Sequence, residues 1–288
     1  MSDTEDDQSS GGNIFLSLVR RVTRKPLYPF PVQWGHDGYQ IFKTLSRILR
    51  NATAEEFDLF ISDFIKFAKT THLPQEIPFF NEFTHVCTST ILFWMVARRE
   101  NASTVRRLME RTSVYLQDQT YNLTIAQRFT PIYGPGTLSG LTPVMFLAQY
   151  QQSDVLKVLL QYGMLERERR PSFIIVCILF SFRRLREHDA LNYTAIIQDV
   201  HECLTLCFRV LTYISITDIE MQIIYGQTPL IKDWRDHIPV SRYLEPCELT
   251  HLCRTTLRRR LLIRGCLPDG IKRLPLPTRL QDYLNLEY

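Results

Sequence analysis

The chain has 288 residues, of which 45% are hydrophobic and 11% aromatic, and its 34 basic and 30 acidic residues give a net charge of +4. This composition is typical of a globular protein with a sizeable core, and the length suggests about two domains. The balanced charge argues against a polybasic protein that binds nucleic acid or a membrane surface.

The N-terminal third is predicted to be helical after an acidic tail. Residues 1–12 are expected to be disordered and do not resemble a secretory signal, and a short helix is expected over 14–24. A second helix follows over 39–51. Thr53 and Glu56 then have the spacing of a capping box, which predicts the start of another helix. That helix carries one apolar stripe, made of Phe57, Phe60, Ile61, Phe64 and Phe67.

The stretch "GLTPVMFLAQYQQSDVLKVLLQYGM", which begins at Gly140, is similar to an ankyrin repeat. Thr142-Pro143 would start the first of two helices, and Gly163 would end the second. Two departures are expected to loosen the edges of this repeat. Met145 replaces the usual histidine, and Gln151-Gln152 replaces a Gly-His pair. The repeat is predicted to occupy residues 140–170.

Residues 91–112 carry a fainter copy of the same pattern, which is either a degenerate repeat or an ordinary helix pair. An insertion near 113–136 separates the two copies. Because about three repeats are normally needed to bury a solenoid core, flanking helices are expected to cap these two pairs. The prediction is therefore a mainly α, compact helical body over 13–225, not an open horseshoe. "GQTPL" at Gly226 is interpreted as a turn.

The segment "ELTHLCRTTLRRRLL" (248–262) is predicted to be an amphipathic helix. Arg254 and Arg258 turn away from its apolar face. One interpretation is a final helix that packs on its own domain, with these arginines in solvent. The apolar face is formed by Leu249, Leu252, Cys253, Thr256 and Leu257.

The helix is followed by a short module that is too small to bury that face. Gly265 and Pro268 end the helix, Asp269-Gly270 is expected to turn the chain, and "LPLP" at 274–277 is expected to be extended. A final short helix carries Leu280, Tyr283, Leu284 and Leu286. Modules of about 40 residues usually need a metal, disulfides or a partner. The uncovered apolar helix therefore predicts a protein partner.

The strings "ELTHLCR", "LPDGI", "LPLP" and "YLNLEY", in this order behind an ankyrin-like repeat, resemble the ankyrin repeat and SOCS box family. The resemblance implies that Leu249, Leu252, Cys253 and Leu257 dock onto elongin C. It also implies that Leu274, Pro275, Leu276 and Pro277 direct the box toward cullin-5. Glu248 departs from the family, which usually has Ser, Thr or Pro there. A carboxylate still favours a helix N-terminus, so the departure is expected to affect affinity and not the mode of binding.

The resemblance further implies a non-catalytic adaptor with two functional parts. The body, with its repeat and the insertion 113–139, would bind an unidentified target protein, and residues 226–288 would form the SOCS box with its linker. Elongin B/C, cullin-5 and its RING partner would then promote ubiquitination and degradation of the target. The alternative is an ankyrin-type interaction scaffold without ligase recruitment. The "LPLP" string favours the adaptor, because a self-packed terminal helix has no need of it.

Other functional classes find little support in the sequence. "GPGTLSG" (134–140) lacks the Lys-Ser/Thr of a P-loop, and "HECLTLC" (201–207) lacks zinc-site spacing, so no active site, metal or cofactor is expected. The seven basic residues within 254–273 lack interleaved aromatics and fit a solvated face or an acidic protein partner better than nucleic acid. The most apolar run, 173–180, is too short to span a membrane. Seven cysteines without a C-x-x-C pair suggest reduced thiols in the cytoplasm.

Overall fold

The computed structural model describes residues 34–69, 80–112, 142–168, 170–180 and 193–287. Regular secondary structure within these ranges is helical throughout. Within them no helix combines the length and apolarity that crossing a membrane requires. The expected tail 1–12, the helix 14–24, the insertion 113–139 and the glycine-rich loop 134–140 lie outside the described residues.

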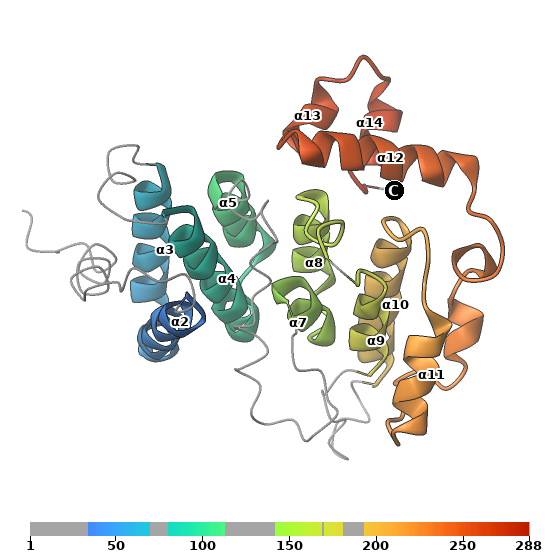
Figure 1. Ribbon diagram of the computed structural model, residues 1–288, viewed down its shortest axis with the longest axis horizontal. Coiled ribbons are helices and arrows are strands. Elements are labelled where there is room, and N and C mark those ends of the chain that lie inside the picture. Colours follow the sequence, from blue (N-terminus) through green and yellow to red (C-terminus); the bar gives the residue numbers. More distant parts are fainter. Residues whose placement is uncertain (1–33, 70–79, 113–141, 169, 181–192, 288) are drawn as a thin grey trace, which may run out of the picture.

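Helices of the described body stack as successive pairs in one row (Figure 1). The first helices of each pair contact one another in the order α2, α4, α7, α9, and the second helices in the order α3, α5, α8, α10. The helices expected to cap two central pairs therefore continue the same stack, which supplies the neighbours that a repeat core needs. The pairs are α2 (Trp34–Asn51) with α3 (Ala54–Lys69), α4 (Phe80–Arg98) with α5 (Ala102–Thr112), α7 (Pro143–Gln149) with α8 (Ser153–Gln161), and α9 (Phe173–Leu179) with α10 (Tyr193–Phe208).

The capping box at the start of α3 is confirmed. The Thr53 backbone N–H donates to Glu56 Oε2 at 2.7 Å, and the Glu56 N–H donates to Thr53 Oγ1 at 3.2 Å. This reciprocal pair satisfies two N–H groups that the first helical turn leaves without partners. The apolar stripe of α3 is confirmed as core, because all five of its members are at most 2% exposed.

Helix α4 begins well before residue 91, where the fainter repeat pattern starts. Its first half is rich in threonine, so the sequence there looks polar although the helix is buried. Thr88 Oγ1 donates to the Thr84 carbonyl at 2.8 Å and Thr90 Oγ1 to the Val86 carbonyl at 2.7 Å. These bonds satisfy the hydroxyl groups inside the helix itself, so burying them costs little.

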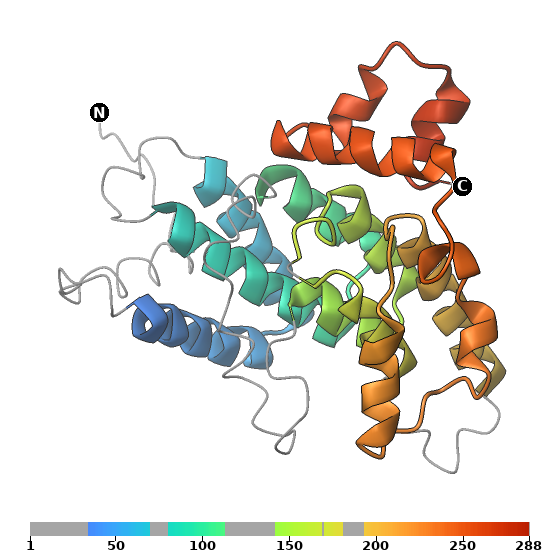
Figure 2. The same cartoon turned by 45° about the vertical axis from the view of Figure 1, so that its right-hand side comes forward.

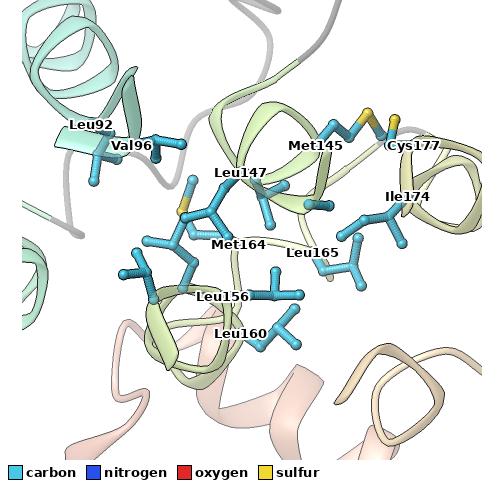
Figure 3. Packing of buried hydrophobic residues seen from close by; sticks show 14 of the residues in the cluster. Leu92, Val96, Met145, Leu147, Leu156, Leu160, Met164, Leu165, Ile174 and Cys177 are labelled. Carbon is cyan, nitrogen blue, oxygen red and sulfur yellow. The ribbon is translucent and has the colours of Figure 1, made fainter. Parts of the chain in front are cut away.

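The α7–α8 pair shows how the departures from the ankyrin pattern are accommodated. Pro143 occupies the first turn of α7, and Gly163 follows α8 with a φ of 74°. Gln151 adopts a φ of 50° where the pattern has glycine. Gln152 donates its amide to the Val96 carbonyl at 3.0 Å and so ties this turn to α4. In Figure 3, Leu147, Leu156 and Leu160 point into the space that α7 and α8 share.

The C-terminal part leaves the stack and returns across it. Helix α11 (Ile216–Ile224) packs on α9, and two short 3₁₀ turns, η5 (Trp234–His237) and η6 (Val240–Arg242), lead onward. Helices α12 (Leu249–Ile263), α13 (Asp269–Lys272) and α14 (Thr278–Leu284) then form a separate layer beside the stack (Figures 1 and 2). Residues 249–287 are called the box below. The expected turn at Asp269-Gly270 is the start of α13.

Candidate protein-binding face of the C-terminal box

The N-terminus of α12 is held in place by residues that precede it. Glu248 is the N-cap residue, but its side chain does not cap the helix. Instead its Oε2 accepts a hydrogen bond from Arg242 Nη1 at 2.9 Å, and its Oε1 accepts one from Ser241 Oγ at 3.1 Å. The bond from Arg242 is the main reason why the pKa of Glu248 falls to about 2. The residue that departs from the family pattern therefore holds the start of α12 through its carboxylate, which accepts hydrogen bonds from Arg242 and Ser241.

One face of α12 is apolar and open to solvent. Leu249 is 75% exposed, Leu252 40% and Leu257 36%, and Cys253 is exposed as well. At 100° per residue these four side chains share one face, as the sequence predicts. They are called the apolar stripe below. The structure thus brings together, on one open surface, all four residues predicted to contact elongin C.

The opposite face of α12 is buried, and three of its four members are polar. His251, Arg254, Arg258 and Leu262 are between 0% and 8% exposed. The interpretation that Arg254 and Arg258 lie in solvent is wrong. They turn away from the apolar stripe as expected, but the stack covers them. Their guanidinium groups donate to backbone carbonyls at or just beyond helix ends, where the carbonyl oxygens can accept a further hydrogen bond.

Arg258 is the central contact between the box and the stack, and its side chain is fully buried. Its Nε donates to Glu166 Oε1 at 2.7 Å. Its Nη1 donates to the Leu284 carbonyl at the end of α14 at 3.0 Å, and its Nη2 donates to the Leu160 carbonyl near the end of α8. One side chain therefore joins α12, α14 and α8. The planar guanidinium group suits this task because it presents several fixed donors.

Two further side chains bind carbonyls that follow the end of α10. Arg254 Nη1 donates to the Arg209 carbonyl at 3.1 Å, and its guanidinium group stacks on the Tyr283 ring with 3.5 Å between its carbon and the ring centroid. His251 Nε2 lies 3.0 Å from the Leu211 carbonyl, so the neutral ring donates from that nitrogen. Burial and, next, the charge of Arg242 lower the pKa of His251 to about 4.

The last residues of the chain attach the box to α8. Leu286 is fully buried and belongs to the core of the stack, with a φ of 65°. Gln161 donates its amide to the Asn285 carbonyl at 3.0 Å and to Glu287 Oε1 at 2.9 Å. Lys157 pairs with the Glu287 carboxylate at 2.5 Å. The sequence pattern placed Leu286 on the final helix, whereas it lies beyond the end of α14 and is inserted into the body.

The box has a small core of its own, built from Leu262, Leu267, Ile271 and Leu284. Leu274 and Leu276 pack against this core, whereas Pro275 and Pro277 are exposed. Residues 274–277 are called the proline loop. The expectation that they are extended is wrong for residues 274–276, which bend. The Leu276 N–H donates to the Leu274 carbonyl at 2.8 Å, and the Gln281 amide donates to both of their carbonyls at 3.1 and 3.0 Å.

Sequence reasoning missed the docked face of α12 and the C-terminal attachment. A signal was present: residues 251, 254, 258 and 262 follow the 3.6-residue period as regularly as the apolar stripe does. Arginine normally lies in solvent, so this period does not look like a buried face in the sequence. Among the described residues no cluster of three or more metal-ligating side chains occurs, and Cys203 and Cys207 are buried in the core.

The SOCS box family matches residues 245–285. The chain is 45% identical over 281 residues to ankyrin repeat and SOCS box protein 17 of Canis lupus familiaris and 43% identical over 278 residues to that of Homo sapiens, in each case over 96% of this chain and 94% of the relative. This chain belongs to the ankyrin repeat and SOCS box protein family.

Another member of the family matches only a short stretch of the chain. Ankyrin repeat and SOCS box protein 10 of Mus musculus is 48% identical over 44 residues, which are 15% of this chain and 9% of that protein. No solved structure matches the chain. The SOCS box and the full-length relatives support an adaptor-type protein of a cullin–RING ubiquitin ligase.

Proposed function

We propose that this protein is the substrate-recognition adaptor of an elongin B/C–cullin-5 ubiquitin ligase. The observation that carries the proposal is the division of α12 into two faces. One face fixes the helix to the stack through buried hydrogen bonds, and the other presents the apolar stripe to solvent. A helix that only closed its own domain would bury its leucines and expose its arginines, which is the reverse arrangement.

Elongin C would take up the apolar stripe by helix-in-groove recognition. Most of the Leu249 side chain is accessible to solvent and can be buried on docking, and full burial of a leucine is worth about 1.5 to 3 kcal/mol. Cys253 is small and polarizable, which suits a tight pocket in which a larger side chain would clash. Because α12 is already folded and anchored, little conformational entropy is lost on docking.

Cullin-5 and its RING partner would assemble beside the proline loop. Leu274 and Leu276 face the core of the box and hold the loop in shape, so Pro275 and Pro277 are the members left for a partner. Proline rings have a fixed φ and no N–H group, so they form a rigid surface without unsatisfied donors. In this arrangement the two leucines would hold the loop in position, and the two prolines would contact cullin-5.

The ankyrin-type stack would bind the target protein, and the chain itself would contribute no catalytic group. Its mechanical role is to hold the target at a fixed orientation to the box, and the contacts of Arg258 and Leu286 give that junction its rigidity. Ubiquitin transfer would be catalysed by the RING partner's side of the complex and would lead to degradation of the target. All seven cysteines are free thiols, which fits our assignment to the cytoplasm.

A pull-down with purified full-length chain tests the proposal. We expect the wild type to retain elongin B/C and cullin-5. We expect Leu249→Ala with Cys253→Phe to lose both, and Pro275→Ala with Pro277→Ala to lose only cullin-5. Ile263→Ala is the matched control, because Ile263 lies on the same helix and is as exposed as Leu249, at 75%. Circular dichroism checks that each variant is folded. A wild-type chain that binds neither partner would leave the alternative, an ankyrin-type scaffold without ligase recruitment.

A further inference from the structure

The proline loop is bordered by exposed cations on both sides. Lys272 and Arg273 precede it and Arg279 follows it, and all three side chains are exposed. These three residues are called the basic rim. The connection between α13 and α14, which contains the loop, lies at the tip of the box farthest from the stack (Figure 1). The basic rim is therefore placed where a partner of the box can reach it without touching the body.

The cations of the basic rim form no ion pair within the described part of the chain, although Asp269 and Asp282 lie three residues before Lys272 and three after Arg279. No ion pair there involves Lys272, Arg273 or Arg279, although other surface cations do pair, as Arg170 does with Asp218 at 2.8 Å. Elsewhere in the box, Arg254 and Arg258 are directed into the junction with the stack. The cations around the proline loop thus remain available to an external anion.

The surroundings of the basic rim favour a protein as its partner over a nucleic acid. Between the cations lie two exposed proline rings, which offer a rigid apolar surface but no hydrogen-bond donors. Binding to single-stranded nucleic acid relies on exposed aromatic rings for base stacking. Tyr283, the nearest tyrosine, is half-buried and already covered by the Arg254 guanidinium group. A mixed apolar and cationic surface of this kind fits a protein that presents carboxylates around a shallow apolar patch.

We propose that the basic rim receives an acidic surface of the protein that covers the proline loop. The inference rests on the proposed function, in which that protein is cullin-5. Rim charges of this kind act mainly on the rate of encounter and little on the rate of dissociation. Their effect is screened over about 8 Å at physiological ionic strength, so it weakens as salt is added. The basic rim would therefore accelerate assembly, whereas the prolines would hold the finished complex.

The test measures association of the chain, already bound to elongin B/C, with cullin-5 at 50, 150 and 300 mM NaCl, over which the screening length falls from about 14 to about 6 Å. The rim variant carries Lys272→Glu, Arg273→Glu and Arg279→Glu. The matched control carries Arg47→Glu, Arg107→Glu and Lys232→Glu, three exposed cations on the stack and its C-terminal extension, and has the same net charge. A neutral variant with glutamine at the three rim positions gives an intermediate charge.

We expect the rim variant to associate at least about tenfold more slowly than the control at 50 mM NaCl, with the neutral variant between them and the difference shrinking at 300 mM. Equal association rates for the rim variant and the control would overturn the inference while leaving the proposed function intact. A wild-type complex that fails to bind cullin-5 at any salt concentration would instead overturn the proposed function. Binding of wild type to duplex RNA or to phosphatidylserine vesicles, lost in the rim variant while cullin-5 association is unchanged, would assign the cations to another polyanion and also overturn the inference.

Discussion

Replacing Arg258 with methionine should loosen the box from the stack. The substitution keeps an unbranched apolar stem but removes the three donors that bind Glu166 and the carbonyls of Leu160 and Leu284. Glu166 is 11% exposed and its Oε2 has no hydrogen-bond partner, so the variant would leave its carboxylate buried without one. Removing one member of a buried ion pair costs about 3 to 5 kcal/mol.

The assay combines a urea titration followed by circular dichroism with hydrogen exchange of the α12 and α14 amides. We expect Arg258→Met to lower the unfolding midpoint and to reduce protection in both helices. Arg260→Met on the exposed face of α12 is the control and should change stability by no more than about 0.5 kcal/mol. Adding Glu166→Gln to Arg258→Met should restore part of the loss, because the unpaired carboxylate is then neutral. Equal stability of Arg258→Met and Arg260→Met would refute the reasoning.

Three further predictions concern the same junction. A Cβ added at Gly163 would lie 2.7 Å from Leu262 Cδ1, whereas one at Gly226 meets nothing within 4 Å, and both glycines have positive φ. Gly226→Ala should therefore cost about 1 to 2 kcal/mol through backbone strain, and Gly163→Ala should cost about 1 to 3 kcal/mol more because the new methyl group meets Leu262. Thermal unfolding measures both losses of stability. Equal losses would contradict the packing of Leu262 against Gly163. Leu286→Ala should cost about 2 to 5 kcal/mol in the same assay, and an effect as small as that of the half-exposed Leu280→Ala would show that the C-terminus is not inserted. The folded His251 ring has a pKa of about 4, so on acidification the unfolded chain takes up a proton before the folded chain does. The contribution of His251 to stability should therefore be full above pH 6.5 and fall toward pH 4. His251→Gln should flatten this dependence of the unfolding free energy on pH, and an unchanged slope would contradict the burial of the neutral ring.

Local patterns were sufficient to predict several elements. The Thr53–Glu56 capping box and the phenylalanine period define α3, and the glycine after α8 is where the ankyrin pattern places it. The apolar stripe of α12 was also predictable, because residues 249–257 alone determine which side chains share a face. In each case the information lies within one or two helical turns.

The remaining features depend on partners that are distant in the sequence. Arg258 is buried because the Leu160 carbonyl and Glu166 happen to lie beneath it, and no pattern within α12 reveals them. Leu286 resembles a residue of an amphipathic final helix until the core of the stack is seen to receive it. The bend at residues 274–276 depends on the Gln281 amide, which a reading based on proline preferences leaves out.

Calorimetric titration of elongin B/C into the full-length chain tests the central claim most directly, with Leu249→Ala and Ile263→Ala compared with the wild type. Both positions are 75% exposed on α12, but Ile263 lies 14 residues, about 21 Å, farther along the helix than Leu249 and beyond the end of the apolar stripe. Burial of the Leu249 side chain on docking is worth about 2 kcal/mol, so Leu249→Ala should weaken binding about 30-fold. Ile263→Ala should leave the affinity unchanged. Equal affinities for the two variants would contradict the assignment of the apolar stripe as the elongin-binding face.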